Sequence, residues 1–234
     1  MRLPERLLSL GLSCAALAAH ADPLDLQPFK AVYNAEWKGL TAASSTMELQ
    51  KSGADSYTYS SVSNARGMFR LAFSETVTQA STFRLVDGRV VPMAFTGTDE
   101  KERPINLSFD WQHKHLTGIA KGHSVELELP DGALDPMSLQ IASMRDLAAS
   151  KLQDKGWLVD SDKLKEFVTR REGTARIETA LGELDTVVYT SQNVGSDRIT
   201  RTWVAPALGY LPVRAERLRG SKLEFTLLIQ SVER

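Results

Sequence analysis

Three histidines come nearest, by residue type and spacing, to a metal site. His113 and His115 are separated by one residue, so both imidazoles fall on one side of an extended segment. His123 lies one predicted hairpin away, and imidazoles at short spacing are typical zinc ligands. No nearby pair of carboxylates is evident, and Lys114 and Lys121 add charge that opposes a bound cation. The sequence therefore favours a solvated turn, and we predict neither a metal nor another cofactor.

Acidic side chains suggest a second chemistry, glycan hydrolysis, which needs two carboxyl groups about 5–10 Å apart in a cleft. The candidates on or near predicted strands are Glu36, Glu75, Asp110, Glu126, Glu178, Glu183 and Glu216. Scattered carboxylates of this kind usually form the solvated face of a sheet. Asp135 and Ser138 are residue types that occur in catalytic sites, but a role in capping a helix explains both. Known nucleophile, metalloprotease and phosphate-loop motifs are absent, so we predict no catalytic residue and lean away from an enzyme.

Large apolar side chains suggest a third chemistry, the binding of an apolar ligand. The candidates for lining such a site are Trp37, Trp111, Trp203 and Met144. Residues of these types more often belong to a core than to a cavity. Their role as ligand contacts therefore depends on whether the fold encloses an empty volume.

The elements that must position these residues include one clear helix. Asp135 can cap its first turn, and Pro136 falls where a missing N–H costs nothing. An apolar stripe then recurs at three- and four-residue steps through Met137, Ile141, Met144 and Ala148. We predict an α-helix over about 136–151, laid across a sheet or plugging it, with Gly156 as a left-handed cap after it.

Around that helix, the chain shows strand patterns with turn signals about every 8–12 residues, the spacing of all-β folds. Phe29 to Trp37 alternates cleanly, and Asp87-Gly88 favours a tight hairpin turn. Met68 to Gln79 is strand-like, and Gly173 is predicted to turn the chain between two strands. Hydroxyls on both faces of Tyr57 to Ser63 predict that its hairpin is a sheet edge or borders a wet groove.

These patterns predict a mainly antiparallel all-β fold. We expect a curved sheet or barrel-like fold of about a dozen strands, with the single helix packed on or in it. Closure would remove exposed edges, and the concave face would be a natural cavity.

The first 21 residues are typical of a secretory signal peptide. Arg2 and Arg6 precede an apolar run from Leu7 to Ala19, and small residues stand at the cleavage positions before Asp22. The run is too short for a spanning helix, which needs roughly 20 apolar residues. A lipid anchor at Cys14 is disfavoured, because the preceding leucine stands one place too late.

Export to the periplasm and one β-rich domain over residues 22–234 follow from this interpretation. Cys14 is the one cysteine, so the mature chain would have no disulfide or thiolate site. The chain has a net charge of −1 and no concentrated cluster of basic residues, which argues against a nucleic-acid partner. No second apolar run reaches membrane length, so we predict a soluble mature protein without a transmembrane segment.

Three motifs carry a resemblance to a known family. They are Tyr33-x-x-x-Trp37-x-Gly39, Asp135-Pro136-Met137-Ser138, and Trp203-Val204-Ala205-Pro206 leading through Tyr210-Leu211-Pro212-Val213-Arg214. The set resembles the bacterial exported family called domain of unknown function 3108, over nearly the whole mature chain. Ala43 departs from it, since glycine is commoner there in such first hairpins. The resemblance implies an exported, β-rich domain without an established activity and supplies no catalytic residues.

Three functional hypotheses follow. The first is non-enzymatic binding of a lipid or other apolar or amphipathic molecule, or of an envelope protein, in the hollow of a curved sheet. The second is a cell-envelope glycan hydrolase with paired strand carboxylates. The third is an envelope assembly or scaffold protein that acts through its surface, which an exposed apolar patch would favour.

Overall fold

The computed structural model of the chain describes residues 26–71, 76–99 and 103–234. The predicted signal peptide, Cys14 and Glu75 lie outside the described residues.

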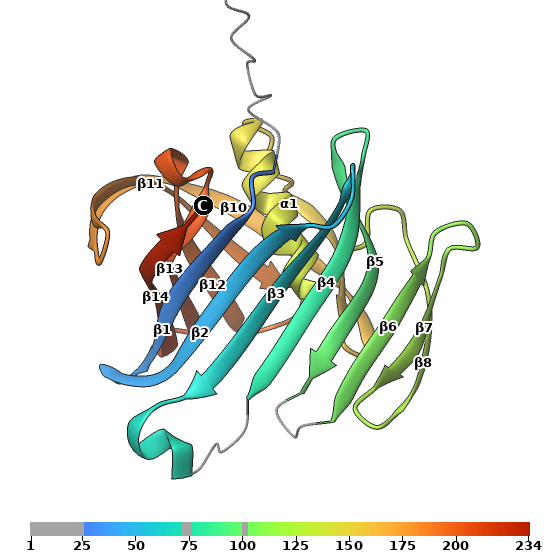
Figure 1. The fold of residues 1–234 in the computed structure, drawn as a ribbon, viewed down its shortest axis with the longest axis horizontal. Helices are drawn as coiled ribbons and strands as arrows, with labels where there is room; N and C mark the ends of the chain where they lie inside the picture. The colour runs from blue at the N-terminus through green and yellow to red at the C-terminus, as the bar shows by residue number, and fades with distance from the viewer. Residues whose placement is uncertain (1–25, 72–75, 100–102) are drawn as a thin grey trace, which may run out of the picture.

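Fourteen strands form one antiparallel sheet (Figure 1). The first eight are β1 (Phe29–Trp37), β2 (Leu40–Lys51), β3 (Ser56–Ala65), β4 (Val77–Val86), β5 (Arg89–Thr98), β6 (Pro104–Asp110), β7 (His115–Ala120) and β8 (His123–Glu128). The remaining six are β9 (Lys155–Asp160), β10 (Lys163–Thr179), β11 (Gly182–Asn193), β12 (Arg198–Ala205), β13 (Leu211–Arg219) and β14 (Lys222–Glu233). The helix α1 (Pro136–Ala148) joins the two sets, and two short 3-10 helices are η1 (Gly67–Leu71) and η2 (Pro206–Leu208).

Two meanders, β1 to β8 and β9 to β14, meet where β1 pairs with β14. The free edges of the sheet are therefore β8 and β9, which are consecutive in the chain and joined through α1. The two edges do not pair, although Leu134, just before the helix, forms an isolated bridge with Leu158 of β9. The predicted curved antiparallel sheet is confirmed, whereas closure into a barrel, the other form considered, is wrong.

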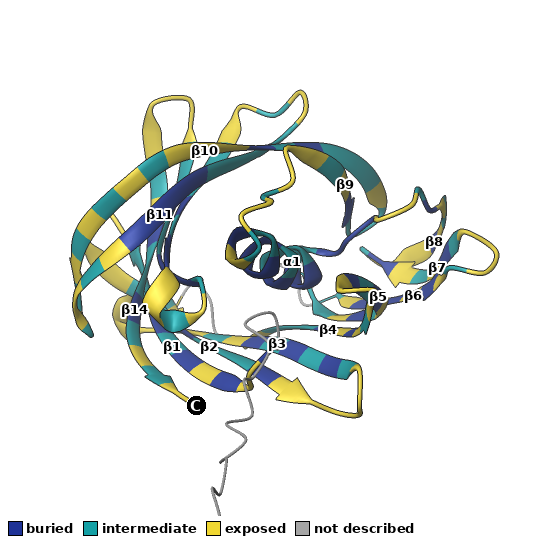
Figure 2. Ribbon diagram, turned by 90° about the horizontal axis from the view of Figure 1, so that it is seen from above, coloured by how far each residue is buried: buried dark blue, intermediate teal, exposed yellow. Residues whose placement is uncertain are grey.

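The helix lies inside the curve of the sheet (Figure 2). Its apolar face joins the main core through Met137, Ile141 and Met144. Near its C-terminal end, Leu147 packs with Val187, Tyr189 and Val204 of the second meander. One amphipathic helix thus buries its apolar side chains against both halves of a sheet that would otherwise expose its concave face.

Asp135 caps this helix as predicted. Its carboxylate accepts hydrogen bonds from the backbone N–H groups of Met137 and Ser138, and the Ser138 hydroxyl in turn accepts from the Asp135 N–H. Pro136 occupies the first turn. The predicted cap at Gly156 is wrong, because the helix already ends at Ala148 and Gly156 belongs to β9.

Three other sequence predictions are corrected by the sheet. Gly173 makes an irregularity within the single strand β10 rather than a turn, since a positive φ of 121° lets it form a bulge. Met68 to Leu71, the start of the strand predicted over Met68 to Gln79, belong to η1 instead. The hydroxyl-rich hairpin of β2 and β3 lies within the sheet and not at an edge, whereas the alternative prediction of a bordering groove stays open, since Ser60 and Ser61 line a hollow across β3 to β6. Two of the hairpin's serines, Ser45 and Ser61, are buried and hydrogen bond with each other across the strands.

Candidate functional site

A cavity of about 460 Å³ opens beside α1, and we call it the α1 pocket. Its walls come from the β4–β5 turn and the start of β5, the residue after β6, the segment 131–134, and the C-terminal half of the helix. Lining side chains include Val90, Pro92, Trp111, Leu134, Ala142 and Arg145. The pocket therefore forms where the crossover between the two sheet edges passes the end of the first meander.

Arg145 places a permanent positive charge in the wall of this pocket. Its residue is 9% exposed, and its Nε donates a 3.3 Å hydrogen bond to the carbonyl oxygen of Gly88. Asp87 and Gly88 both have positive φ, as the predicted tight turn requires. That turn brings a backbone carbonyl to the guanidinium, and a side chain at position 88 would be strained there.

Trp111 forms a fixed apolar wall opposite the helix. Its indole N–H donates a 2.6 Å hydrogen bond to the carbonyl oxygen of Pro92. The ring also stacks on Phe109, with centroids 6.0 Å apart. Both contacts hold the aromatic face at the pocket and leave the indole N–H satisfied, so the ring offers a ligand an apolar surface.

Two carboxylates also line the pocket, and they differ in environment. Burial raises the pKa of the Asp146 carboxyl above its ordinary value, while a hydrogen bond with the Gln153 backbone and the charge of Arg145 act in the opposite direction. Asp131 is exposed and lies 3.2 Å from the Lys114 ammonium. The polar end of the site therefore combines cations with one carboxyl group that gains a proton more readily than a free aspartate.

A buried polar network fixes the start of the helix on the sheet. Ser81 of β4, which is fully buried, donates a 2.6 Å hydrogen bond to Asp135 Oδ2, and Ser138 Oγ lies 2.8 Å from the same oxygen. Burial nevertheless raises the pKa of the Asp135 carboxyl, because these hydrogen bonds offset only part of the desolvation. Gln140 also donates to the Tyr59 hydroxyl at 2.5 Å.

The four side chains predicted to contact a ligand do not gather at one place. Trp111 lines the α1 pocket, whereas Met144 is buried in the core beside it. Trp37 packs edge-on against Phe69 near η1, and Trp203 lies on β12 under the Arg214 guanidinium. Ligand binding by these residues stays a prediction. Arg145 was not predicted as a pocket residue, because the helical pattern marks it only as a polar position. Its contact with the Gly88 carbonyl arises from the tertiary structure.

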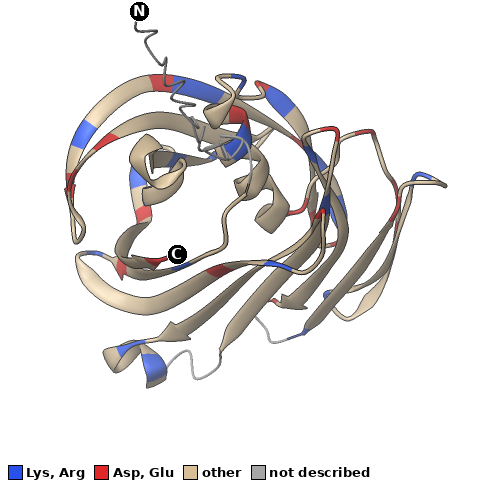
Figure 3. Ribbon diagram, turned by 45° about the horizontal axis from the view of Figure 1, so that its top comes forward, with Lys and Arg blue, Asp and Glu red and all other residues tan. Residues whose placement is uncertain are grey.

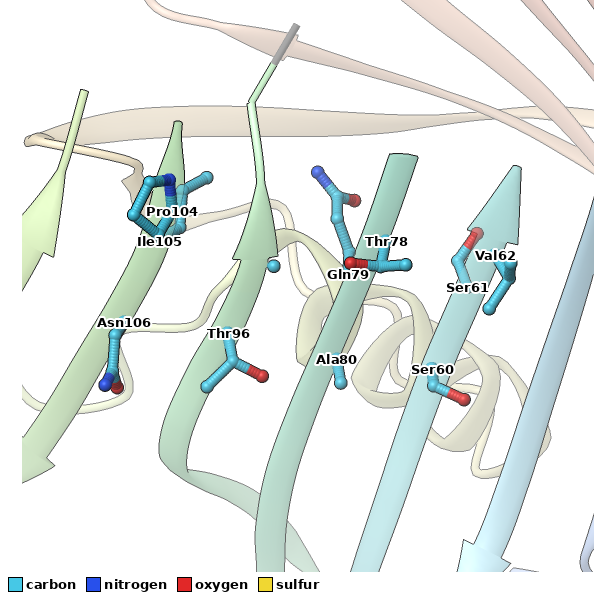
Figure 4. Close-up of a pocket in the computed structure, with 11 residues that line it drawn as sticks. Ser60, Ser61, Val62, Thr78, Gln79, Ala80, Thr96, Pro104, Ile105 and Asn106 are labelled. Carbon is cyan, nitrogen blue, oxygen red and sulfur yellow. The ribbon is translucent and has the colours of Figure 1, made fainter. Parts of the chain in front are cut away.

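A second hollow lies across β3 to β6 and is drawn in Figure 4. Its volume is about 430 Å³, and small residues of adjacent strands, among them Ser60, Ala80 and Thr96, form one row across it. None of its lining residues is titratable. A third, of about 380 Å³, lies between the β10–β11 turn and strands β13 and β14. Neither combines charge with an aromatic wall as the α1 pocket does.

The histidines each have a different acidic neighbour. His113 Nδ1 lies 2.8 Å from Asp110, His115 Nε2 lies 3.0 Å from Glu126, and His123 Nε2 lies 3.4 Å from Asp162. Within residues 26–71, 76–99 and 103–234, no group of three or more potential metal ligands is found. No sequence pattern indicates the contact with Asp162, because that residue comes from the distant β9–β10 turn.

Those of the predicted strand carboxylates that the structure describes do not line the α1 pocket. Several form ion pairs instead: Glu183 lies 2.9 Å from Arg176, and Glu216 lies 2.5 Å from Arg214. A hydrogen bond from His113 lowers the pKa of Asp110. Such pairs belong to the ordinary polar surface of a sheet.

No helix in the described part of the chain combines the length and the apolar character needed to cross a membrane.

Comparison with known proteins places this chain in a family. A family model described as "Protein of unknown function (DUF3108)" matches residues 32–224. Two solved structures are also similar, each at 9% sequence identity. One is a lipoprotein candidate from Parabacteroides distasonis, with a TM-score of 0.36; the match covers 89% of this chain and 96% of that chain. The other is a candidate exported protein with YmcC-like fold from Bacteroides fragilis, with a TM-score of 0.39; the match covers 90% of this chain and 97% of that chain. Among curated proteins, none matches.

The family match covers far more than half of the chain and includes all the residues of the three motifs that carried the resemblance. The resemblance is therefore confirmed, and the chain belongs to the DUF3108 family of proteins of unknown function.

Proposed function

We propose that this chain is an exported binding protein that holds a small amphipathic molecule with an anionic head group in the α1 pocket. The observation that carries the proposal is the pocket itself, in which a buried guanidinium and a fixed indole face the same volume. A volume of about 460 Å³ falls in the range of about 300–1,000 Å³ typical of small-molecule sites.

The lining defines two ends for such a ligand. Apolar side chains from β5, the segment before the helix and the helix itself would enclose the apolar part: Val90, Pro92, Trp111, Leu134 and Ala142. Arg145 and Arg89 would receive the head group, because a guanidinium binds carboxylate, sulfonate or phosphate oxygens through paired hydrogen bonds. Asp131 opposes such a ligand less than its charge suggests, since Lys114 lies beside it.

Export supports the cellular setting of the proposal. The apolar run before Asp22 and the small residues around the cleavage position are features of a signal peptide. A pocket that holds one amphiphile suits a compartment in which such molecules must cross water between membranes. We therefore assign the protein to the periplasm as part of the same proposal, with residues 22–234 acting as one β-rich domain.

A test of the pocket uses decanesulfonate, whose head group stays anionic at every pH, and isothermal titration calorimetry. Replacing Ala142 with leucine would fill the pocket and should weaken binding at least about fivefold, because overfilling a packed site costs about 1–3 kcal/mol. Ala148→Leu, on the exposed end of the same helix, is the matched control and should bind like the wild type. Equal affinity of the Ala142 variant, or equal affinity of the wild type for decyltrimethylammonium, contradicts the proposal.

A glycan hydrolase is the second candidate, and one observation favours it. Asp131 and Asp146 line the same pocket, and the raised pKa of Asp146 suits a general acid. This candidate differs from the strand carboxylates that the sequence suggested. Release of soluble fragments from peptidoglycan by the wild type, with loss in Asp146→Asn, would favour it over simple binding.

A further inference from the structure

The β1–β2 turn and η1 lie at the end of the sheet opposite the β4–β5 turn (Figure 1), and they carry exposed apolar residues among basic ones. We define this basic-apolar tip by the β1–β2 turn and η1, with apolar Trp37, Leu40, Met68 and Leu71 and basic Lys38, Arg66 and Arg70. Leu71 is 93% exposed, Met68 70% and Leu40 53%. Large apolar side chains that are this exposed and adjacent mark an interaction site.

Local contacts hold the tip in place. The Arg66 N–H donates to the Ala42 carbonyl at 2.8 Å, which ties the chain leaving β3 to strand β2. The Phe69 ring then packs edge-on against Trp37, with centroids 6.0 Å apart. Phe69 is therefore half-buried, while its neighbour Met68 stays in solvent. The exposure of the apolar side chains is thus set by the fold of the turn and of η1.

The charge at the tip is positive. Lys38 Nζ lies 4.5 Å from the Trp37 ring centroid, a cation–π contact that keeps the ammonium beside the apolar group. Among the ion pairs of the described residues, none involves Lys38, Arg66 or Arg70. Figure 3 shows basic residues on η1 with no acidic residue on it.

We propose that the basic-apolar tip docks the protein on the surface of an anionic lipid bilayer. Met68 and Leu71 would enter the boundary between head groups and acyl chains, and Trp37 would lie at head-group level, where tryptophan is enriched. The three cations would meet lipid phosphates, whose attraction for basic residues adds to apolar burial. The α1 pocket lies near the other end of the sheet, so the two proposals stand independently.

The size of the tip favours a bilayer over a protein partner. A stable protein interface buries about 800 Å² on each side, with a packed apolar centre and few charges there. The tip offers four apolar side chains and three basic residues in two short segments, which is the composition of a shallow membrane contact.

Vesicle sedimentation with the exported, processed chain tests the proposal. Vesicles of phosphatidylethanolamine with phosphatidylglycerol should retain at least about tenfold more protein than vesicles of phosphatidylcholine, because each basic residue adds roughly a fivefold factor at an anionic surface. Added salt should release the protein, since it screens these charges. Equal retention by both kinds of vesicle, or no retention, overturns the proposal.

Two variants separate the apolar and the charged contributions. Met68→Asp with Leu71→Asp should reduce retention at least about tenfold, because both side chains leave the acyl boundary. Val86→Asp, an exposed apolar position at the other end of β4, is the matched control and should bind normally. If circular dichroism shows that the first variant folds poorly, the double variant Arg66→Gln with Arg70→Gln tests the same docking surface. It should lose the preference for vesicles that contain phosphatidylglycerol. Wild-type retention by whichever variant is folded contradicts docking through the tip, as does dimer formation through it without vesicle binding.

Discussion

At the scale of single residues, burial decides which ionisable groups matter. The buried Asp135 carboxylate accepts four hydrogen bonds. It serves the fold, because it joins the helix start to Ser81 of the sheet. Asp146 lies about three turns further along the helix, in the wall of the α1 pocket. Both carboxyl groups have raised pKa values through desolvation. Only Asp146 is placed where its charge acts on a ligand.

Binding of decanesulfonate should therefore depend on pH through Asp146. Its pKa is raised in the folded chain, so the carboxyl is neutral below that pKa and becomes an anion as pH rises through it. The anion would repel the sulfonate, and affinity should fall over that interval. Asp146→Asn should bind more tightly at neutral pH and lose this dependence in calorimetric titrations. A variant that retains the wild-type pH profile would show that another group is responsible.

At the scale of elements, close packing fixes features that the local pattern misrepresents. Gly156 was predicted as a helix cap from its position after a helix, but its place in β9 is set by the ring of Phe167 on the paired strand β10. A Cβ at position 156 would lie 2.8 Å from that ring. The glycine is needed for close approach between an edge strand and a buried aromatic side chain, not for an unusual backbone angle.

Gly156→Ala should consequently lower the free energy of unfolding by about 1–3 kcal/mol, because the buried Phe167 ring must shift. Urea denaturation measures this change. Gly53→Ala is the matched control, since its Cβ would meet Ser56 Cβ at an ordinary 3.4 Å in an exposed turn, and its effect should be within about 0.5 kcal/mol. Equal effects of the two substitutions would show that backbone freedom, and not the ring, determines the cost.

At the scale of the whole molecule, α1 links two meanders whose strands pair with each other at the β1–β14 seam. The helix start is tied to Ser81 and Tyr59 in the first meander. Further along, Ser143 hydrogen bonds with Tyr189 of the second. The helix thus acts as a strut inside the curve, and its loss would leave the concave faces of both halves exposed to water (Figure 2).

The two meanders should therefore unfold together. Leu147→Ala removes an almost fully buried side chain between α1 and β11 and should lower stability by about 2–5 kcal/mol. Circular dichroism and tryptophan fluorescence should still report one coincident transition. Val194→Ala, at an exposed turn position, should have little effect. Two separated transitions in the wild type would contradict the prediction that residues 22–234 form one domain.

The sequence by itself determined the local elements. Alternation in Phe29–Trp37, the Asp87-Gly88 turn and the Asp135 cap depend on neighbours a few residues apart, so their physics is contained in short windows. The antiparallel class followed from the density of such signals, and the family followed from its motifs.

Only the tertiary structure decided how these elements meet. Whether the edges β8 and β9 pair, and that Arg145 reaches the Gly88 carbonyl, depend on contacts between residues far apart in the chain. Buried serines show the same limit: Ser45 and Ser61 hydrogen bond with each other between β2 and β3, and Ser81 of β4 donates to Asp135. A side chain's type fixes what it can bond, whereas its partner is fixed by the packing of the whole sheet around one helix.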